Sequence, residues 1–121
     1  RLSPHFALTV ATNSNREHLD AVLRRMNIAH FFPTTVARQD YRQAKPQPDA
    51  FVTAAAKIGL SPDQCVVIED TYKGVTAAVS AGIRCIAVPN EYTLHNDFSR
   101  ASFVLSSLNQ LTPEVVWGLL E

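Results

Sequence analysis

Strand-like and helix-like segments alternate along this chain, and the alternation restricts the possible folds more than any other feature. The runs CVVI (65–68) and CIAV (85–88) are continuously apolar, as expected of strands buried on both faces of a parallel sheet. Short turns separate each strand-like run from the next helix-like segment, an order that favours parallel strands joined by helices. We therefore predict a single α/β domain over residues 1–121, with a doubly wound, Rossmann-like parallel sheet and helices on both faces.

The boundaries of these elements follow from apolar spacing and from capping residues. The predicted strands are 6–12, 31–37, 65–69 and 84–89, with a shorter run at 101–107. Ser14 or Asn15 can cap the first helix, whose apolar residues recur to Met26, and Pro48 can begin a second helix that ends before Gly59. Two further helices are expected at 74–81, closed by Gly82, and at 112–120, capped by Thr112.

Composition excludes several classes of partner. Eleven basic and eleven acidic residues give a formal net charge of zero, and no run of Lys or Arg suggests binding to nucleic acid. No apolar run approaches the about 20 residues that span a membrane, so we expect no membrane partner. Cys65 and Cys85 lie in apolar settings typical of reduced core thiols in a cytoplasmic protein, and the four histidines are scattered, so no structural metal is expected.

Two adjacent acids, Glu69 and Asp70, directly follow the third predicted strand. Ligands of open parallel sheets bind at the carboxyl ends of the strands. If both carboxylates converge there, they suit Mg²⁺, which takes one or two protein carboxylates together with substrate phosphate. If Glu69 instead follows the alternation of the strand, the two side chains diverge and one of them merely caps the next helix. Gly74 would allow close backbone approach beside them.

Polar residues at two other loops complete the candidate site. Thr12, Asn13 and Ser14 follow the first predicted strand, where they either cap the next helix or bind an anion such as phosphate. Lys45 lies in the sequence KPQPD, whose prolines stiffen the loop. Lys45 is therefore either a solvated surface side chain or a cation held in a fixed place.

Taken in order, these residues resemble the haloacid dehalogenase-like hydrolase superfamily, in its β-phosphoglucomutase and phosphoglycolate phosphatase branch. The segment LTVATNSNREHLDAVL resembles the second motif of that family, and residues 45–88, from KPQPD to CIAV, resemble its third and fourth motifs. The resemblance implies that Thr12 and the backbone of Asn13 bind the transferred phosphoryl group and that Lys45 neutralises its charge. It also implies that Asp70, helped by Glu69, holds Mg²⁺.

The resemblance further implies a phosphatase of small phosphorylated metabolites that works through an aspartyl-phosphate. The first motif of the family, a strand ending in Asp-x-Asp, supplies the attacking aspartate, and none of the six aspartates here begins such a motif. In the family this strand lies between the strands that correspond to 6–12 and 65–69, and a cap domain precedes the second motif. Because the chain begins with Arg1 and lacks both parts, we expect a fragment that is inactive alone.

Three other functions stay open at this point. A phosphomutase of the same superfamily would use the same residues, and a non-catalytic interaction or phosphate-binding module could keep the same scaffold. A phospho-receiver domain also combines acids, Thr and Lys at strand ends, but there the acidic pair comes first and the Lys last, whereas Lys45 precedes Glu69 here. We expect the strands that flank the missing one to pair directly, to pair with a partner chain or to accept an upstream segment, because unrepaired edges invite self-association.

Overall fold

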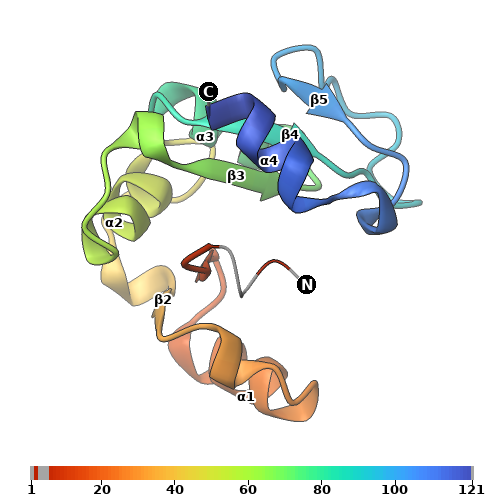
Figure 1. Cartoon of the computed structure of the whole chain (residues 1–121). Helices are drawn as coiled ribbons and strands as arrows, with labels where there is room; N and C mark the ends of the chain where they lie inside the picture. The colour runs from red at the N-terminus through yellow and green to blue at the C-terminus, as the bar shows by residue number, and fades with distance from the viewer. Residues whose placement is uncertain (1, 3–5, 121) are drawn as a thin grey trace.

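The computed structural model describes residue 2 and residues 6–120, and it has the predicted alternation of strands and helices (Figure 1). None of the helices in this part of the chain is long and apolar enough to cross a membrane. The elements are β1 (Thr9–Ala11), α1 (Arg16–Arg25), β2 (Thr34–Val36), the one-turn 3₁₀ helix η2 (Arg38–Asp40), α2 (Asp49–Lys57), β3 (Val66–Glu69), α3 (Tyr72–Ser80), β4 (Arg84–Ala87), β5 (Phe103–Val104) and α4 (Pro113–Leu120).

Side-chain caps begin α1 and α3. Of the two candidate caps of α1, Asn15 is the one used, because its side-chain oxygen accepts from the backbone N–H of His18 at 2.8 Å. Helix α3 begins earlier than predicted because the Thr71 hydroxyl caps it and accepts from the N–H of Gly74 at 3.0 Å. The strands are shorter than their apolar runs, and β1 keeps only the end of the predicted strand 6–12.

Every observed strand pair is parallel, as the sequence predicts, but the strands form two separate sheets. Strand β1 pairs with β2, and β3 pairs with β4, which pairs with β5. Helix α2 joins the two halves. Its Ala50 and Ala54 pack with Val36 at the end of β2, whereas its Phe51 packs in the core of the other half with Val67 of β3. Strands β1 and β3 are each left with one unpaired edge within the described residues.

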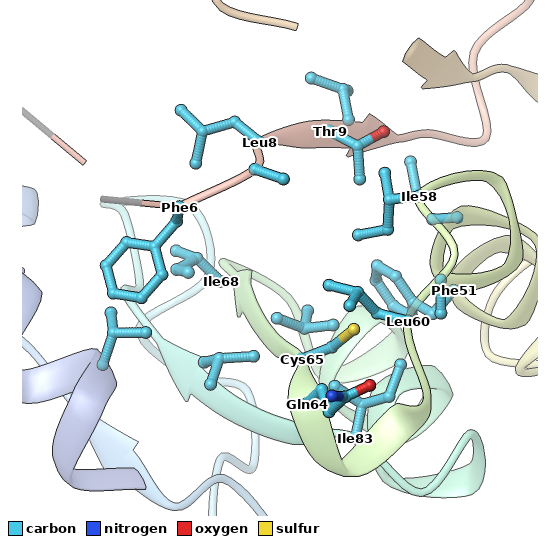
Figure 2. Close-up of a pocket in the computed structure, with 18 of the residues that line it drawn as sticks. Phe6, Leu8, Thr9, Phe51, Ile58, Leu60, Gln64, Cys65, Ile68 and Ile83 are labelled. Carbon is cyan, nitrogen blue, oxygen red and sulfur yellow. The ribbon is translucent and has the colours of Figure 1, made fainter. Parts of the chain in front are cut away.

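An apolar cavity of about 410 Å³ lies between β1 and β3 (Figure 2). Residues of both strands line it, together with side chains of α2 and of the segment that leads into β3. The flanking strands therefore do not pair directly, which was one of the three expected ways of closing the sheet. The labelled side chains that line the cavity are Phe6, Leu8, Thr9, Phe51, Ile58, Leu60, Gln64, Cys65, Ile68 and Ile83.

Gly74 in the first turn of α3 makes room for the side chain of Glu69. A Cβ built on Gly74 would lie 1.9 Å from Cδ and 2.0 Å from Cγ of Glu69, far inside contact distance. The close approach expected of Gly74 is thus to a side chain and not to backbone. Any larger residue at position 74 must displace the carboxylate of Glu69.

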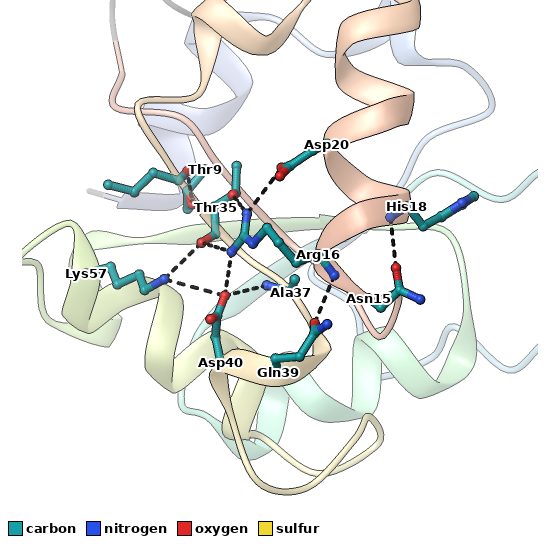
Figure 3. A network of polar contacts seen from close by, with 11 residues as sticks. Thr9, Asn15, Arg16, His18, Asp20, Thr35, Ala37, Gln39, Asp40 and Lys57 are labelled. Atoms are coloured by element: carbon teal, nitrogen blue, oxygen red, sulfur yellow. Dashed lines mark hydrogen bonds and ion pairs between the residues drawn. The ribbon is translucent and has the colours of Figure 1, made fainter.

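A charged network holds α1, β2, η2 and α2 together (Figure 3). Arg16 at the start of α1 donates to the carboxylate of Asp40 at 2.6 Å, and Lys57 at the end of α2 lies 3.6 Å from the same carboxylate. The backbone N–H of Ala37 also donates to Asp40 at 2.8 Å. This backbone hydrogen bond, together with Arg16 and Lys57, holds the pKa of Asp40 below its ordinary value.

We predict that Gly74→Ala destabilises the chain by about 1–3 kcal/mol, because the new methyl group forces Glu69 from its place. The matched control is Gly118→Ala in α4, where a Cβ meets nothing within 4 Å. At that position the better helix propensity of Ala should stabilise the chain by up to about 1 kcal/mol. Urea denaturation measures the free energy of unfolding of both variants. In a chain that also carries Glu69→Ala, Gly74→Ala should lower the free energy of unfolding much less. If Gly74→Ala lowers it equally with Glu69 present and absent, this explanation is contradicted.

We predict that Asp40→Asn lowers the free energy of unfolding by about 1–2 kcal/mol at pH 7, because hydrogen bonds to the charged carboxylate are lost. Since the pKa of Asp40 is lowered on folding, its stabilising effect is present above the unfolded value near 4 and disappears as the pH falls through the folded value. The difference between Asp40→Asn and the unmodified chain should therefore shrink below about pH 4. Asp20→Asn, which removes a more exposed 3.5 Å contact with Arg16, is the control and should change little at any pH.

Candidate functional site

Lys45 lies between the carboxyl ends of β1 and β3 and contacts both. Its ammonium donates to the backbone oxygen of Ala11 at 3.0 Å and to the carboxylate of Glu69 at 2.8 Å. The same ammonium lies 4.6 Å from the ring centre of Phe51 on α2. Lys45 is therefore a cation held in a fixed place, and it connects the two sheets at their shared edge.

The ion pair between Lys45 and Glu69 is largely removed from solvent. Each side chain is only 11% exposed, so screening by water is weak and the loss of either partner would leave an almost buried charge. The pKa of Cys85, on the neighbouring strand β4, is affected by the charges of the same two side chains. Burial, and next the negative charge of Glu69, raise the pKa of the Cys85 thiol to about 12, while Lys45 opposes the shift. The thiol is thus protonated at neutral pH and is a core residue.

Thr12 and Asn13 follow β1 and lie beside the Lys45 loop. The hydroxyl of Thr12 accepts from the backbone N–H of Ser14 at 3.0 Å, which leaves its own hydrogen able to donate elsewhere. The side-chain oxygen of Asn13 accepts from the backbone N–H of Lys45 at 3.2 Å. The segment after the first strand and the Lys45 loop are thereby tied to one another.

The two adjacent acids diverge at the end of β3. Glu69 turns back toward Lys45, and its other oxygen accepts from the backbone N–H of Asp70 at 3.1 Å. Asp70 is exposed and accepts from the side-chain amide of Asn90, which follows β4, at 3.0 Å. In this structure the two carboxylates have different partners, Lys45 for Glu69 and Asn90 for Asp70, and the binding of Mg²⁺ by the pair stays a prediction. Asp70 alone of the two has a carboxylate directed away from Lys45.

The donor set at this edge suits an anion more than an isolated cation. In the described part of the chain, no three His, Cys, Asp or Glu side chains cluster as metal ligands would. The Thr12 hydroxyl and the Lys45 ammonium are hydrogen-bond donors, and Asp70 is a single hard acceptor of the kind that Mg²⁺ takes when a phosphate supplies further oxygens. The side chains at this edge are therefore of the kinds that bind a phosphate, and the Asp70 carboxylate is of a kind that can supply one oxygen ligand to a metal ion.

The structure brings Lys45 together with Glu69 and Asn13, and it leaves Asp70 separate with Asn90. Sequence reasoning missed two contributors. Phe51 lay in a helix pattern that indicated core packing, and nothing in that pattern indicated a contact with a lysine. Tyr41 lay in the polar loop 38–49, where a lone aromatic residue gives no periodic signal, yet its hydroxyl donates to the backbone oxygen of Thr12 at 2.8 Å.

Comparison with known proteins identifies the family. The sequence model of a family described as haloacid dehalogenase-like hydrolase matches residues 3–88. Protein CbbY of Rhodobacter capsulatus is 30% identical over 112 residues, which are 90% of this chain and 49% of that protein. Fructose-1-phosphate phosphatase YqaB of Escherichia coli is 36% identical over 81 residues, 67% of this chain and 43% of that protein.

Solved structures agree with this assignment. The crystal structure of CbbY from Rhodobacter sphaeroides in complex with phosphate superposes with a TM-score of 0.84 at 31% identity and covers 89% of this chain and 49% of that one. A putative β-phosphoglucomutase from Thermotoga maritima gives a TM-score of 0.76 at 26% identity, with 85% and 49% covered. The chain spans about half the length of these relatives. It belongs to the haloacid dehalogenase-like hydrolase family.

Proposed function

We propose that this chain carries the phosphate-binding part of a Mg²⁺-dependent hydrolase that acts on small phosphorylated metabolites. The observation that carries the proposal is the placement of Thr12, Asn13 and Lys45 at one sheet edge, in a member of this hydrolase family. The similarity to a fructose-1-phosphate phosphatase and to a CbbY structure with bound phosphate supports the substrate class. Phosphatase is preferred to phosphomutase because the relatives named as phosphatases match the sequence directly.

Each residue has a role that its contacts support. The hydroxyl of Thr12 and the backbone N–H of Asn13 donate to phosphoryl oxygens, and the ammonium of Lys45 offsets their charge. Glu69 holds Lys45 in place through their 2.8 Å ion pair. Asp70, oriented by Asn90, would hold Mg²⁺, which when bound would neutralise further phosphate charge.

The attacking carboxylate must come from outside residues 1–121, because no Asp-x-Asp occurs in them. We propose that an apolar strand ending in that motif occupies the cavity between β1 and β3. The cavity lies between two unpaired strand edges and is lined mainly by apolar side chains. Lys45 contacts the carboxyl ends of both edges, so a parallel strand inserted there would deliver its last residues beside the phosphate donors.

We predict that the isolated 121-residue chain does not hydrolyse p-nitrophenyl phosphate with Mg²⁺ present, because it lacks the nucleophile. A chimera tests the rest of the proposal: the part of the Escherichia coli YqaB phosphatase that precedes its matched region is fused in front of this chain. The chimera should hydrolyse fructose 1-phosphate when Mg²⁺ is added. Lys45→Met and Asp70→Asn should each lower its kcat by about 10²-fold or more, whereas Arg25→Met, which alters an exposed cation in the last turn of α1, should leave it unchanged.

The contradicting results are specific. Turnover by the isolated chain that depends on Lys45 would show that no external nucleophile is needed. A chimera that is folded by circular dichroism and binds phosphate but hydrolyses nothing would favour the non-catalytic phosphate-binding module. Conversion of one sugar phosphate isomer into another, without release of phosphate, would favour the phosphomutase.

A further inference from the structure

Asn90, in the turn that follows β4, holds the carboxylate of Asp70 from the side. Its side-chain NH₂ donates to one oxygen of that carboxylate, Oδ2, at 3.0 Å. Strands β3 and β4 pair in parallel, with Glu69 opposite Ala87, so their carboxyl ends lie next to each other. One side chain from the end of β4 therefore reaches the acid that follows β3.

Backbone groups of the same turn fix the orientation of the Asn90 carboxamide. Its oxygen accepts from the backbone N–H of Tyr92 at 2.8 Å, which is the pattern of an Asx turn. The backbone N–H of Asn90 donates to the hydroxyl of Thr93 at 3.0 Å, and its backbone oxygen accepts from the N–H of Thr93 at 3.1 Å. Because an NH₂ group cannot accept from Tyr92, only one orientation of the amide satisfies both of its contacts, and it directs the NH₂ at Asp70.

The loop that begins at Asn90 is attached to the start of α3 at a second point. The side-chain oxygen of Asn96 accepts from the backbone N–H of Tyr72 at 2.8 Å. Two residues further along, Phe98 is buried in the core cluster that contains Val75 of α3. The loop is thus held at both ends, and Asn90 is a fixed point against which the Asp70 carboxylate rests.

We propose that Asn90 is a positioning residue that occupies Oδ2 of Asp70 and leaves Oδ1 as the oxygen available to a divalent cation. The inference rests on the proposed function and states how the exposed Asp70 is oriented for it. No partner of Oδ1 is found among the described residues. Asn90 acts through Asp70 and not as a ligand, because its carbonyl oxygen is engaged by Tyr92 and its NH₂ is a donor.

The test titrates Mn²⁺, a paramagnetic substitute for Mg²⁺, into the ¹⁵N-labelled chain. Bound Mn²⁺ broadens the NMR resonances of nearby backbone N–H groups, so the broadening of residues 69–72 gives an apparent affinity at Asp70. Asn90→Ala should weaken this affinity by about tenfold, the lower end of the losses found when a residue that orients a metal ligand is removed. Asp70→Asn should abolish the selective broadening.

Two further variants separate positioning from support of the loop. Asn96→Ala is the matched control, because Asn96 holds the same loop to α3 through Tyr72 and has no contact with Asp70 among the described residues. It should leave the affinity nearly unchanged. Asn90→Ser keeps an oxygen that can accept from the backbone N–H of Tyr92 but loses the NH₂, so it should weaken the affinity as Asn90→Ala does.

The outcomes distinguish this inference from the proposed function. If Asn90→Ala and Asn90→Ser leave the affinity unchanged, or if Asn96→Ala weakens it equally, the positioning role is overturned and the proposed function stands. Thermal unfolding shows whether each variant is folded. If Mn²⁺ causes no selective broadening at residues 69–72 of the unmodified chain, the metal-binding role of Asp70 in the proposed function fails, and this inference fails with it.

Discussion

The ion pair between Lys45 and Glu69 is the contact on which the arrangement of this chain depends most. Strands β1 and β3 do not pair, so the two sheets share no backbone hydrogen bond at the edge where ligands of such folds bind. Lys45 replaces that connection, because its ammonium contacts Ala11 at the end of one strand and Glu69 at the end of the other. A nearly buried charge pair tolerates little displacement, so the spacing of the two strand ends is fixed by side chains.

Other features of the sequence make sense as support for that pair. Gly74 is required because any Cβ there would collide with Glu69, and the absence of a side chain lets the carboxylate lie over the first turn of α3. Helix α2 packs against both halves and presents Phe51 to the ammonium of Lys45. The network around Asp40 then holds α1 and α2 against β2, so the segment after β1 keeps its place relative to the Lys45 loop.

The sequence predicted well whatever depends on local pattern. Parallel strands and their helices followed from continuous apolar runs such as CVVI, and the caps at Ser14 or Asn15 and at Thr112 followed from short polar side chains before apolar periodicity. The direction of the Glu69 side chain was harder to predict, because the local sequence agrees both with convergence and with divergence of the two acids. Only the distant Lys45 decides between them, since it gives Glu69 a partner 24 positions away along the chain.

Tyr41 marks the limit of sequence reasoning more sharply. Its loop has no periodicity, and a tyrosine there is as compatible with an exposed ring as with a buried one. Its importance comes from a hydrogen bond to Thr12, 29 positions earlier, which exists only once β1, η2 and α2 are assembled. The adjacent acids Glu69 and Asp70 are likewise given different partners by the fold. Glu69 pairs with Lys45 between the two sheets, and Asp70 is exposed and accepts a hydrogen bond from Asn90.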